Sequence, residues 1–373
     1  MKRAITVAAA IAGAALILLA AWTVHRHLGG ARHYPPYSPP AGATVTQLPA
    51  LEEGKRTLLV EAATDISFMR PFLRDFQRLH PDVSITYSDM LSTQLLDRAL
   101  VACRTGEGVA DIYLTVATDH LVRLANDGCG RTASSDAATA APGWRKWRDE
   151  VFAFALEPAV FVYDRRALSD AEVPRSHLQL IQMLRSNPAA WDGRIGTYDI
   201  RQSGIAYNFA EFDARQSSIF GRLIEGMGRS HVRLFCCSNE MVSAVDQGRI
   251  RLAYNVQLSY AYFALVHSDR IGIVIPSDYQ AVQTRSLMIP RDARHVAAAE
   301  TFLDYLLSSR AQALDRQLLT APGRGGGERF VESDRLLSQI DVSAELLRLQ
   351  DAARRRRLIR EWSQAVSGSE PPH

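Results

Sequence analysis

Residues 57–87 read TLLVEAATDISFMRPFLRDFQRLHPDVSITY, and this stretch decides the fold class. It opens with a short apolar run, TLLVEAA, which predicts a buried strand. Apolar side chains then recur at helical spacing from Phe68 to Leu79, until Pro81 ends the predicted helix. Residues 83–87 alternate between apolar and polar side chains, which is typical of a second strand. The order strand, helix, strand predicts a parallel βαβ unit.

The same rhythm continues along the chain. Residues 91–100 predict a helix and residues 110–116 a third strand, so the first unit is βαβαβ, a parallel sheet with helices on both faces. A long apolar strand, 151–163, is interrupted by Glu157-Pro158, and we expect it to cross between two lobes. The alternation of helices and strands starts again over 176–275, which predicts a second α/β lobe. One more strand is expected at 287–289 and a helix at 293–308, both returning to the first lobe.

Length and composition support two lobes. The chain has 373 residues and 41.3 kDa, more than a single core usually holds. Apolar residues make up 47% and charged residues 22%, and the net charge of +3 is too small to predict nucleic-acid binding. The expected segments are a signal or anchor at 1–33, a linker at 34–55, lobe one at 56–158, lobe two at 159–280, the return to lobe one at 281–320, a C-terminal loop and helices packing on the lobes at 321–365, and a disordered tail at 366–373.

The N-terminus resembles a targeting segment. Met1-Lys2-Arg3 precedes an uncharged run over residues 4–24, long enough to span a bilayer. Leu19-Ala20-Ala21 also offers a small-residue cleavage site, so a retained inner-membrane anchor and a cleaved signal both stay open. Either interpretation predicts a periplasmic protein. Residues 34–49 are rich in Pro, Gly and Thr without periodicity and predict an extended tether, with folded structure beginning near Arg56.

Export to an oxidising compartment favours disulfide bonds between nearby cysteines. We expect Cys103 to pair with Cys129. A bond between the neighbours Cys236 and Cys237 is strained, so two buried thiols are the alternative there. None of these spacings is that of a metal site, and we expect all four cysteines to be structural.

Several passages in a fixed order resemble the type II periplasmic solute-binding proteins of ABC transporters. They are similar to the ferric-iron and phosphorylated-solute branch of that family, which includes phosphoglycerate transport regulatory proteins. The passages span roughly residues 56–319 and are 59–65, 72–76, 80–83, 109–113, 191–196, 252–255, 276–279 and 297–308. The resemblance implies a two-lobed α/β fold, each lobe a mixed sheet flanked by helices, behind an N-terminal signal or anchor helix. It also implies that a ligand binds in the cleft between the lobes.

The branch divides between iron and anionic solutes. Ferric-binding members use two adjacent tyrosines after an Asn-containing strand, and here Gln257 and Leu258 stand after Tyr254-Asn255-Val256. Tyr260 and Tyr262 lie two apart on a predicted helix and point in different directions. The iron-binding alternative is therefore disfavoured, and no metal or cofactor is expected.

An anion site is the preferred interpretation. Ser203-Gly204 opens a predicted helix just beyond Tyr198-Asp199-Ile200, where free backbone N–H groups and the helix dipole favour a phosphate or carboxylate. In the family this Ser-Gly pair lies in the cleft, whereas without the resemblance Ser203 is better read as a plain N-cap. Ligands of open α/β sheets gather where strands end. The other candidates at such ends are Thr64, Asp65, Ser88, Asp89, Ser92, Thr93, Thr115 and Asp199.

Four further candidates carry charge or amide groups. Glu157 interrupts an apolar strand, so it needs either the wet cleft or a salt bridge within the hinge. Arg201 and Arg285 could bind an anionic group through both guanidinium nitrogens, although each alone is more often an exposed surface residue. Asn255 could orient ligand hydroxyls.

The sequence contains no catalytic motif with a recognisable nucleophile, metal triad, phosphate loop or dinucleotide fingerprint, so we expect no enzyme. The predicted function is a monomeric periplasmic receptor that closes over a small anionic metabolite and presents it to an ABC permease. Signalling to a membrane sensor kinase is the alternative for the same closed form.

Overall fold

A computed structural model of the chain describes residues 37–54, 56–215, 217–318, 337–339 and 342–366. None of the helices in these ranges is long and apolar enough to cross a membrane. The predicted targeting segment, the glycine-rich stretch after residue 318 and the tail beyond residue 366 lie outside the described residues.

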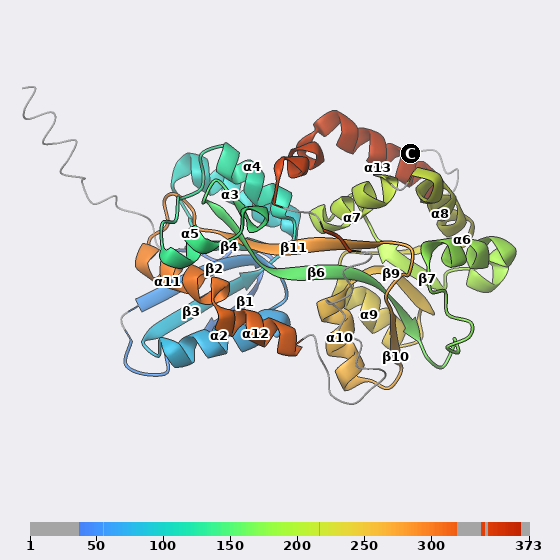
Figure 1. Cartoon of the computed structure of the whole chain (residues 1–373), viewed down its shortest axis with the longest axis horizontal. Coiled ribbons are helices and arrows are strands. Elements are labelled where there is room, and N and C mark those ends of the chain that lie inside the picture. The colour runs from blue at the N-terminus through green and yellow to red at the C-terminus, as the bar shows by residue number, and fades with distance from the viewer. Residues whose placement is uncertain (1–36, 55, 216, 319–336, 340–341, 367–373) are drawn as a thin grey trace, which may run out of the picture. The chain divides into compact units, whose positions relative to one another are not determined.

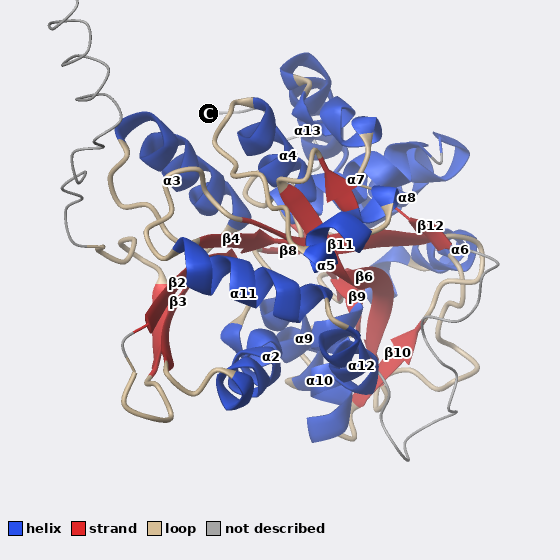
Figure 2. Ribbon diagram, turned by 60° about the vertical axis from the view of Figure 1, so that its left-hand side comes forward, coloured by secondary structure: helices blue, strands red, loops and turns tan. Residues whose placement is uncertain are grey.

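Lobe one is the predicted α/β unit (Figure 1). Its strands run in the order β1-β3-β2-β4, with β2 parallel to β3 and β4. Helices lie on both sides of the strands (Figure 2). Its elements are β1 (Thr44–Leu48), β2 (Arg56–Ala63), α2 (Ile66–Leu79), β3 (Val83–Asp89), α3 (Ser92–Thr105), β4 (Ile112–Thr115), α4 (Thr118–Asn126), α5 (Asp136–Ala140), η1 (Gly143–Arg145), β5 (Lys146–Trp147), α11 (Val296–Leu307) and α12 (Ser309–Leu318).

Lobe two repeats the pattern with β7 and β9 parallel and β8 at the edge. Its elements are α6 (His177–Ser186), η2 (Pro188–Trp191), β7 (Ile195–Tyr198), α7 (Gly204–Arg215), α8 (Ser217–Arg229), β8 (Arg233–Phe235), α9 (Ser238–Asp246), β9 (Leu252–Gln257), α10 (Leu258–His267) and β10 (Ile271–Val274). The apolar side chains form two separate buried clusters, one centred on each lobe. This separation confirms the predicted two-lobed fold.

Two long antiparallel strands connect the lobes. They are β6 (Val151–Asp164) and β11 (Gln280–Met288), which lie side by side in the middle of the sheet order (Figure 1). β6 confirms the predicted crossing strand, and Glu157-Pro158 lies within it rather than ending it. The strand expected at 287–289 is only the end of β11, because polar residues such as Gln283 and Arg285 masked its buried, two-sided pairing.

The predicted linker at 34–55 is wrong over part of its length. Residues 44–48 form β1, which pairs antiparallel with β3 and buries Leu48. The flanking Pro and Gly residues hid a short TVTQL segment whose β-branched residues suit an edge strand. Folded structure therefore begins before Arg56.

The C-terminal segment contacts both lobes. η3 (Ala344–Gln350) reaches α4 of lobe one, where Gln350 bonds to Asp119. α13 (Ala352–Val366) buries Leu358 and Trp362 in the lobe-two cluster. The short strand β12 (Leu337–Gln339) pairs with β11.

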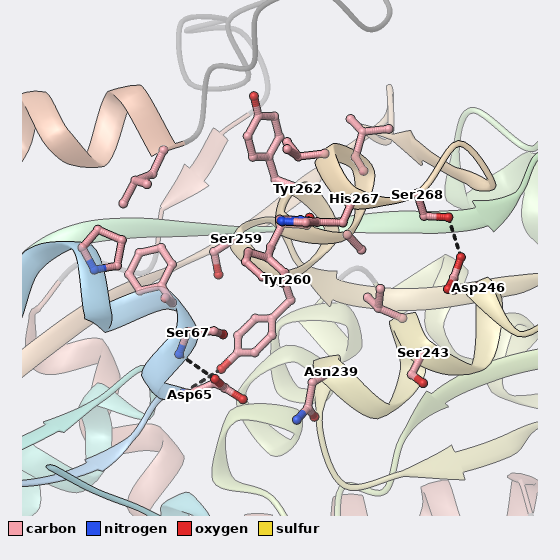
Figure 3. Close-up of a pocket in the computed structure, with 18 of the residues that line it drawn as sticks. Asp65, Ser67, Asn239, Ser243, Asp246, Ser259, Tyr260, Tyr262, His267 and Ser268 are labelled. Atoms are coloured by element: carbon pink, nitrogen blue, oxygen red, sulfur yellow. Dashed lines mark hydrogen bonds between the residues drawn. The ribbon is translucent and has the colours of Figure 1, made fainter. Parts of the chain in front are cut away.

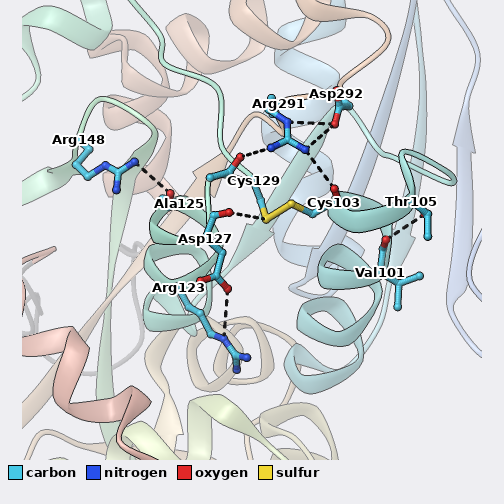
Figure 4. The surroundings of a disulfide bond; sticks show 11 residues. Val101, Cys103, Thr105, Arg123, Ala125, Asp127, Cys129, Arg148, Arg291 and Asp292 are labelled. Carbon is cyan, nitrogen blue, oxygen red and sulfur yellow. Dashed lines mark hydrogen bonds and ion pairs between the residues drawn. A yellow bond between two sulfur atoms is a disulfide. The ribbon is translucent and has the colours of Figure 1, made fainter. Parts of the chain in front are cut away.

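The predicted Cys103–Cys129 disulfide is confirmed, with 5.5 Å between the two Cα atoms. It joins the end of α3 to the turn after α4, and Arg291 donates to the carbonyl of Cys103 beside it (Figure 4). The sequence left open whether Cys236 and Cys237 are bonded or are two buried thiols, and in the structure these half-buried residues form a disulfide with each other between β8 and α9.

Candidate functional site

A cavity of about 940 Å³ lies between the two lobes. Figure 3 shows Asp65 and Ser67 of lobe one on one side of it and Asn239 and Tyr260 of lobe two on the other. Most of its wall is apolar, and further lining residues come from α12. Its lining residues include Asp65, Ser67, Phe68, Asn239, Ser259 and Tyr260.

Helices from both lobes begin beside this cleft. In lobe one, α2 and α3 start directly after β2 and β3 end, and in lobe two α7, α9 and α10 follow β7, β8 and β9. The first turn of a helix leaves backbone N–H groups without intrahelical partners and carries positive partial charge. Asp65 uses one such group, because its carboxylate accepts from the N–H of Ser67 at 2.7 Å.

Direct hydrogen bonds join the lobes across the cleft. The N–H of Asp65 donates to the Tyr260 hydroxyl at 3.0 Å. The Thr93 hydroxyl donates to the carbonyl of Gln202 at 3.1 Å. The N–H of Gly204 donates to Ser92 Oγ, also at 3.0 Å. The described structure is therefore a closed form, in which lobe one and lobe two touch directly.

Gly204 permits this closure. A Cβ built on Gly204 would lie 2.5 Å from Cε1 of His120 and 3.2 Å from Ser92 Oγ. Real Cβ atoms do not approach other atoms so closely, so a side chain here would hold α7 away from lobe one. The sequence predicts that the Gly204 N–H donates to a bound anion, and the structure adds that Gly204 packs against His120.

Ser203 lies at the predicted place but its hydroxyl is already engaged. Ser203 Oγ accepts from the N–H of Ala206 at 3.3 Å, which is the N-cap arrangement that the sequence left open. The side chain is buried, and Gly204 gives its N–H to Ser92. In the closed form, the Ser203 hydroxyl therefore caps α7, and the Gly204 N–H forms a hydrogen bond between the lobes.

Glu157 and Arg285 form the hinge salt bridge that the sequence gave as the alternative for Glu157. Both side chains are buried, and Arg285 Nη2 donates to Glu157 Oε2. Ser259 completes the group, because its N–H and its hydroxyl donate to Glu157 at 2.9 and 2.8 Å. The guanidinium carbon of Arg285 lies 3.7 Å from the centre of the Phe68 ring. Arg285 Nε and Nη1 are buried without a hydrogen-bond partner among the described residues.

Asp199, Arg201 and Asn255 bond within lobe two. Arg201 donates twice to Asp199, at 2.8 Å for each bond, and this pairing holds the pKa of Asp199 below its usual value despite burial. Asn255 Nδ2 donates to buried Asp213 at 2.8 Å. The structure thus places these three predicted residues near the starts of lobe-two helices, but their charged or amide groups have partners already.

The remaining predicted residues lie where β2, β3 and β4 end. Thr115 Oγ1 accepts from the N–H of Ala117, and Thr64 Oγ1 is buried without a partner among the described residues. Ser88 is also buried. Burial, followed by the charge of Asp65, raises the pKa of Asp89 to about 7. Asp89 pairs with Ala62 of β2, and Asp65 follows the end of β2, so these two acidic residues stand at the ends of neighbouring strands.

Several cavity-lining side chains were not predicted as ligand residues. They are Ser67, Phe68, Asn239 and Ser259, and Tyr260 was considered only as an iron ligand. All of them lie in the first turns of α2, α9 and α10, directly after predicted strands. The rule that ligands gather at strand ends could have identified them.

Among the described residues, one group of three His, Cys, Asp or Glu side chains has ligand atoms close enough to hold a metal ion. It consists of Cys236, Cys237 and Glu240, and its two sulfur atoms are bonded to each other.

Comparisons place these features among known proteins. The family model described as bacterial extracellular solute-binding protein matches residues 58–317. No curated protein matches the chain. The substrate-binding protein of an ABC transporter from Agrobacterium tumefaciens is 30% identical, with a TM-score of 0.82, covering 88% of this chain and 99% of that one.

Two more distant solved structures share the fold alone. The periplasmic binding protein AfuA from Actinobacillus pleuropneumoniae, with fructose-6-phosphate bound, is 15% identical with a TM-score of 0.65, covering 85% of this chain and 100% of that one. Iron-bound HitA from Pseudomonas aeruginosa is 17% identical with a TM-score of 0.60, covering 83% of this chain and 99% of that one.

Proposed function

The chain belongs to the family of bacterial extracellular solute-binding proteins, and we propose that it captures a small anionic organic solute in the cleft between its lobes. As a periplasmic monomer without turnover of its own, it then presents the solute to an ABC permease. The solute is a phosphorylated, phosphonate or carboxylate metabolite.

One observation carries this proposal: helix N-termini from both lobes border a single large cavity. The starts of α2, α9 and α10 contribute Ser67, Asn239 and Ser259 to its wall. Backbone N–H groups and the positive ends of helix dipoles favour negatively charged ligand groups. A ligand that touches both lobes also stabilises the closed form over the open one, because only the closed form offers both sets of contacts.

Charge at the hinge supports an anionic group in the ligand. Arg285 is fully buried, and Glu157 bonds only one of its nitrogens. Its guanidinium packs on Phe68, which lines the cavity. Arg285 is not itself a lining residue, but it contacts two residues that are, Phe68 and Ser259, so its positive charge favours an anionic ligand group at this end of the cavity.

Fructose-6-phosphate and iron are bound by two proteins of the same fold, so the fold leaves the choice of ligand to side chains. An iron site of tyrosines is not favoured here. Tyr260 and Tyr262 lie two positions apart on α10, and the Tyr260 hydroxyl is hydrogen-bonded to Asp65. These contacts favour an organic anion over a ferric ion.

A thermal-shift screen tests the proposal. Sugar phosphates, glycerate phosphates, phosphonates and di- or tricarboxylates are compared with ferric citrate, each at increasing concentration. A ligand at a hundredfold excess over its Kd should stabilise the folded protein by about 2.7 kcal/mol. A shift with ferric citrate alone would overturn the choice of ligand. Steady turnover of a bound compound would overturn the assignment as a receptor.

A further inference from the structure

The lobe-one side of the cavity carries negative charge that an anionic solute alone would not use. Asp65 lines the cavity and caps α2. Asp89 ends β3 beside Ala62 of β2, three residues before Asp65. Burial, followed by the charge of Asp65, raises the pKa of Asp89.

Arg285, by contrast, favours a negatively charged group in the ligand. Its Nε and Nη1 atoms are fully buried and have no partner among the described residues. The guanidinium contacts Phe68 at 3.7 Å and lies 3.3 Å from Ser259 Oγ, and both of these residues line the cavity. Asp315 on α12 is a further charged neighbour, and burial raises its pKa to about 7 although Arg285 opposes this rise.

A simple anion would face repulsion from Asp65 and Asp89, and a simple cation would face repulsion from Arg285 and from the positive ends of the helices. A ligand with both charges avoids these two penalties. We propose that the solute is zwitterionic, with an ammonium group bound by Asp65 and Asp89 and an anionic group directed to Arg285 and the helix N-termini. This inference rests on the proposed function.

Thr64 agrees with this arrangement. Its hydroxyl is buried without a partner among the described residues, directly before Asp65. The backbone carbonyl of Thr64 accepts from the buried Tyr87 hydroxyl, and this bond fixes the loop after β2 to β3. An ammonium group near Asp65 could donate to the Thr64 hydroxyl as well as to the carboxylates.

Matched pairs of probes test the inference by isothermal titration calorimetry on the full exported chain. The pairs are O-phosphoethanolamine with ethyl phosphate, 2-aminoethylphosphonate with ethylphosphonate, and β-alanine with propionate. In at least one pair the amino compound should bind at least about tenfold more tightly than its partner without the amine.

Variants then locate the ammonium group. Asp89→Asn and Asp65→Asn should each lower the affinity for the amino compound by about tenfold or more. The affinity for its amine-free partner should stay unchanged or rise. Asparagine keeps the helix cap at position 65. Asp97→Asn is the control, because Asp97 is exposed on α3 and its loss changes the net charge equally. It should alter neither probe.

The outcomes separate the two proposals. Equal binding within every pair, or equal losses of both members in the Asp65 and Asp89 variants, overturns the zwitterion while an anionic solute stands. No binding by any probe overturns the zwitterion and counts against the anionic solute as well.

Discussion

Gly204 lies against the ring of His120, so the first turn of α7 in lobe two meets α4 of lobe one with no side chain between them. The contact is shared with Ser92, whose hydroxyl accepts from the Gly204 N–H. Closure of the cleft therefore depends on a missing side chain as much as on hydrogen bonds.

We expect Gly204→Ala to impair closure. The added methyl group would lie 2.5 Å from His120 Cε1, so the lobes would remain apart. Affinity for the solute found in the thermal-shift screen should fall at least about tenfold, measured by calorimetry. Small-angle scattering with the solute present should give a larger radius of gyration than for the wild type. Gly221→Ala is the matched control, because a Cβ there meets open space on α8. Equal affinities for the two variants would contradict this role.

Glu157→Gln should strongly destabilise the protein. The substitution removes the carboxylate that bonds the buried Arg285 guanidinium, and such losses typically lower the free energy of unfolding by about 3–5 kcal/mol. Urea denaturation measures the change. The double variant Glu157→Leu with Arg285→Met should recover most of the stability, because no charge stays buried.

The exposed pair Arg357 and Glu361 on α13 provides the control for the hinge pair. Glu361→Gln should change the free energy of unfolding by less than about 1 kcal/mol. If Glu157→Gln were as mild as Glu361→Gln, the stability of the folded protein would not depend on the buried pair of Glu157 and Arg285.

Gln350→Ala should loosen the C-terminal segment from lobe one. Buried Asp119 accepts from Asn208 at 2.7 Å and from Gln350 at 2.5 Å. Removing a hydrogen bond to a charged group lowers stability by roughly 1.5–3 kcal/mol, and urea denaturation should show this loss. Gln350→Glu should be worse, because it places a second negative charge beside Asp119. Gln247→Ala, at an exposed residue, should stay within about 0.5 kcal/mol of the wild type. The prediction fails if Gln350→Glu is as stable as Gln350→Ala.

Asp89 should make stability fall as pH rises from about 4 to about 7. Burial raises its folded pKa to about 7, so in this range the folded state holds a proton that the unfolded chain has lost. The other titratable groups around it are Asp65, Tyr87 and Tyr260. Urea denaturation at several pH values compares the wild type with Asp89→Asn.

The stability of the wild type relative to Asp89→Asn should be greatest near pH 4 and should decline towards pH 7. Asp315 has a raised pKa of about 7 as well, but it is present in both proteins and cancels in the difference. A difference that stays constant with pH would show that Asp89 titrates at its ordinary value.

Loss of the Cys103–Cys129 disulfide should lower the free energy of unfolding by about 3.5 kcal/mol, as chain entropy predicts for cysteines 26 residues apart. The double variant Cys103→Ser with Cys129→Ser is compared with the wild type by urea denaturation. Cys236→Ser with Cys237→Ser is the control, because adjacent cysteines close almost no loop. Equal losses in both double variants would show that loop closure is not the source of the stabilisation.

Among the elements that local pattern missed, β1 and most of β11 depend on distant partners. β1 is only five residues long, and its pairing with β3 stabilises it. β11 carries polar residues that would be unusual in a buried strand without Glu157 of β6 beside Arg285. In both cases the stabilising contact lies far away in the sequence.

The candidate site divides in the same way. Ser203 and Gly204 were predicted at the start of a helix, and α7 begins there. The Ser203 hydroxyl caps the helix through a local bond, the alternative that the sequence left open, whereas the contact of Gly204 with His120 depends on how the lobes meet. Phe68 was predicted as a helix face residue, but its contact with Arg285 comes from β11, which is remote in the chain.

By itself, the sequence determined the alternation of strands and helices, the division into two lobes and the strand ends at which helices begin, because hydrophobic periodicity and capping act over a few residues. The tertiary structure alone decided which charges pair, which hydroxyls are already engaged and which side chains face the cavity. Those outcomes depend on contacts between segments more than a hundred residues apart, such as Glu157 with Arg285 and Asp65 with Tyr260, and no local pattern encodes them.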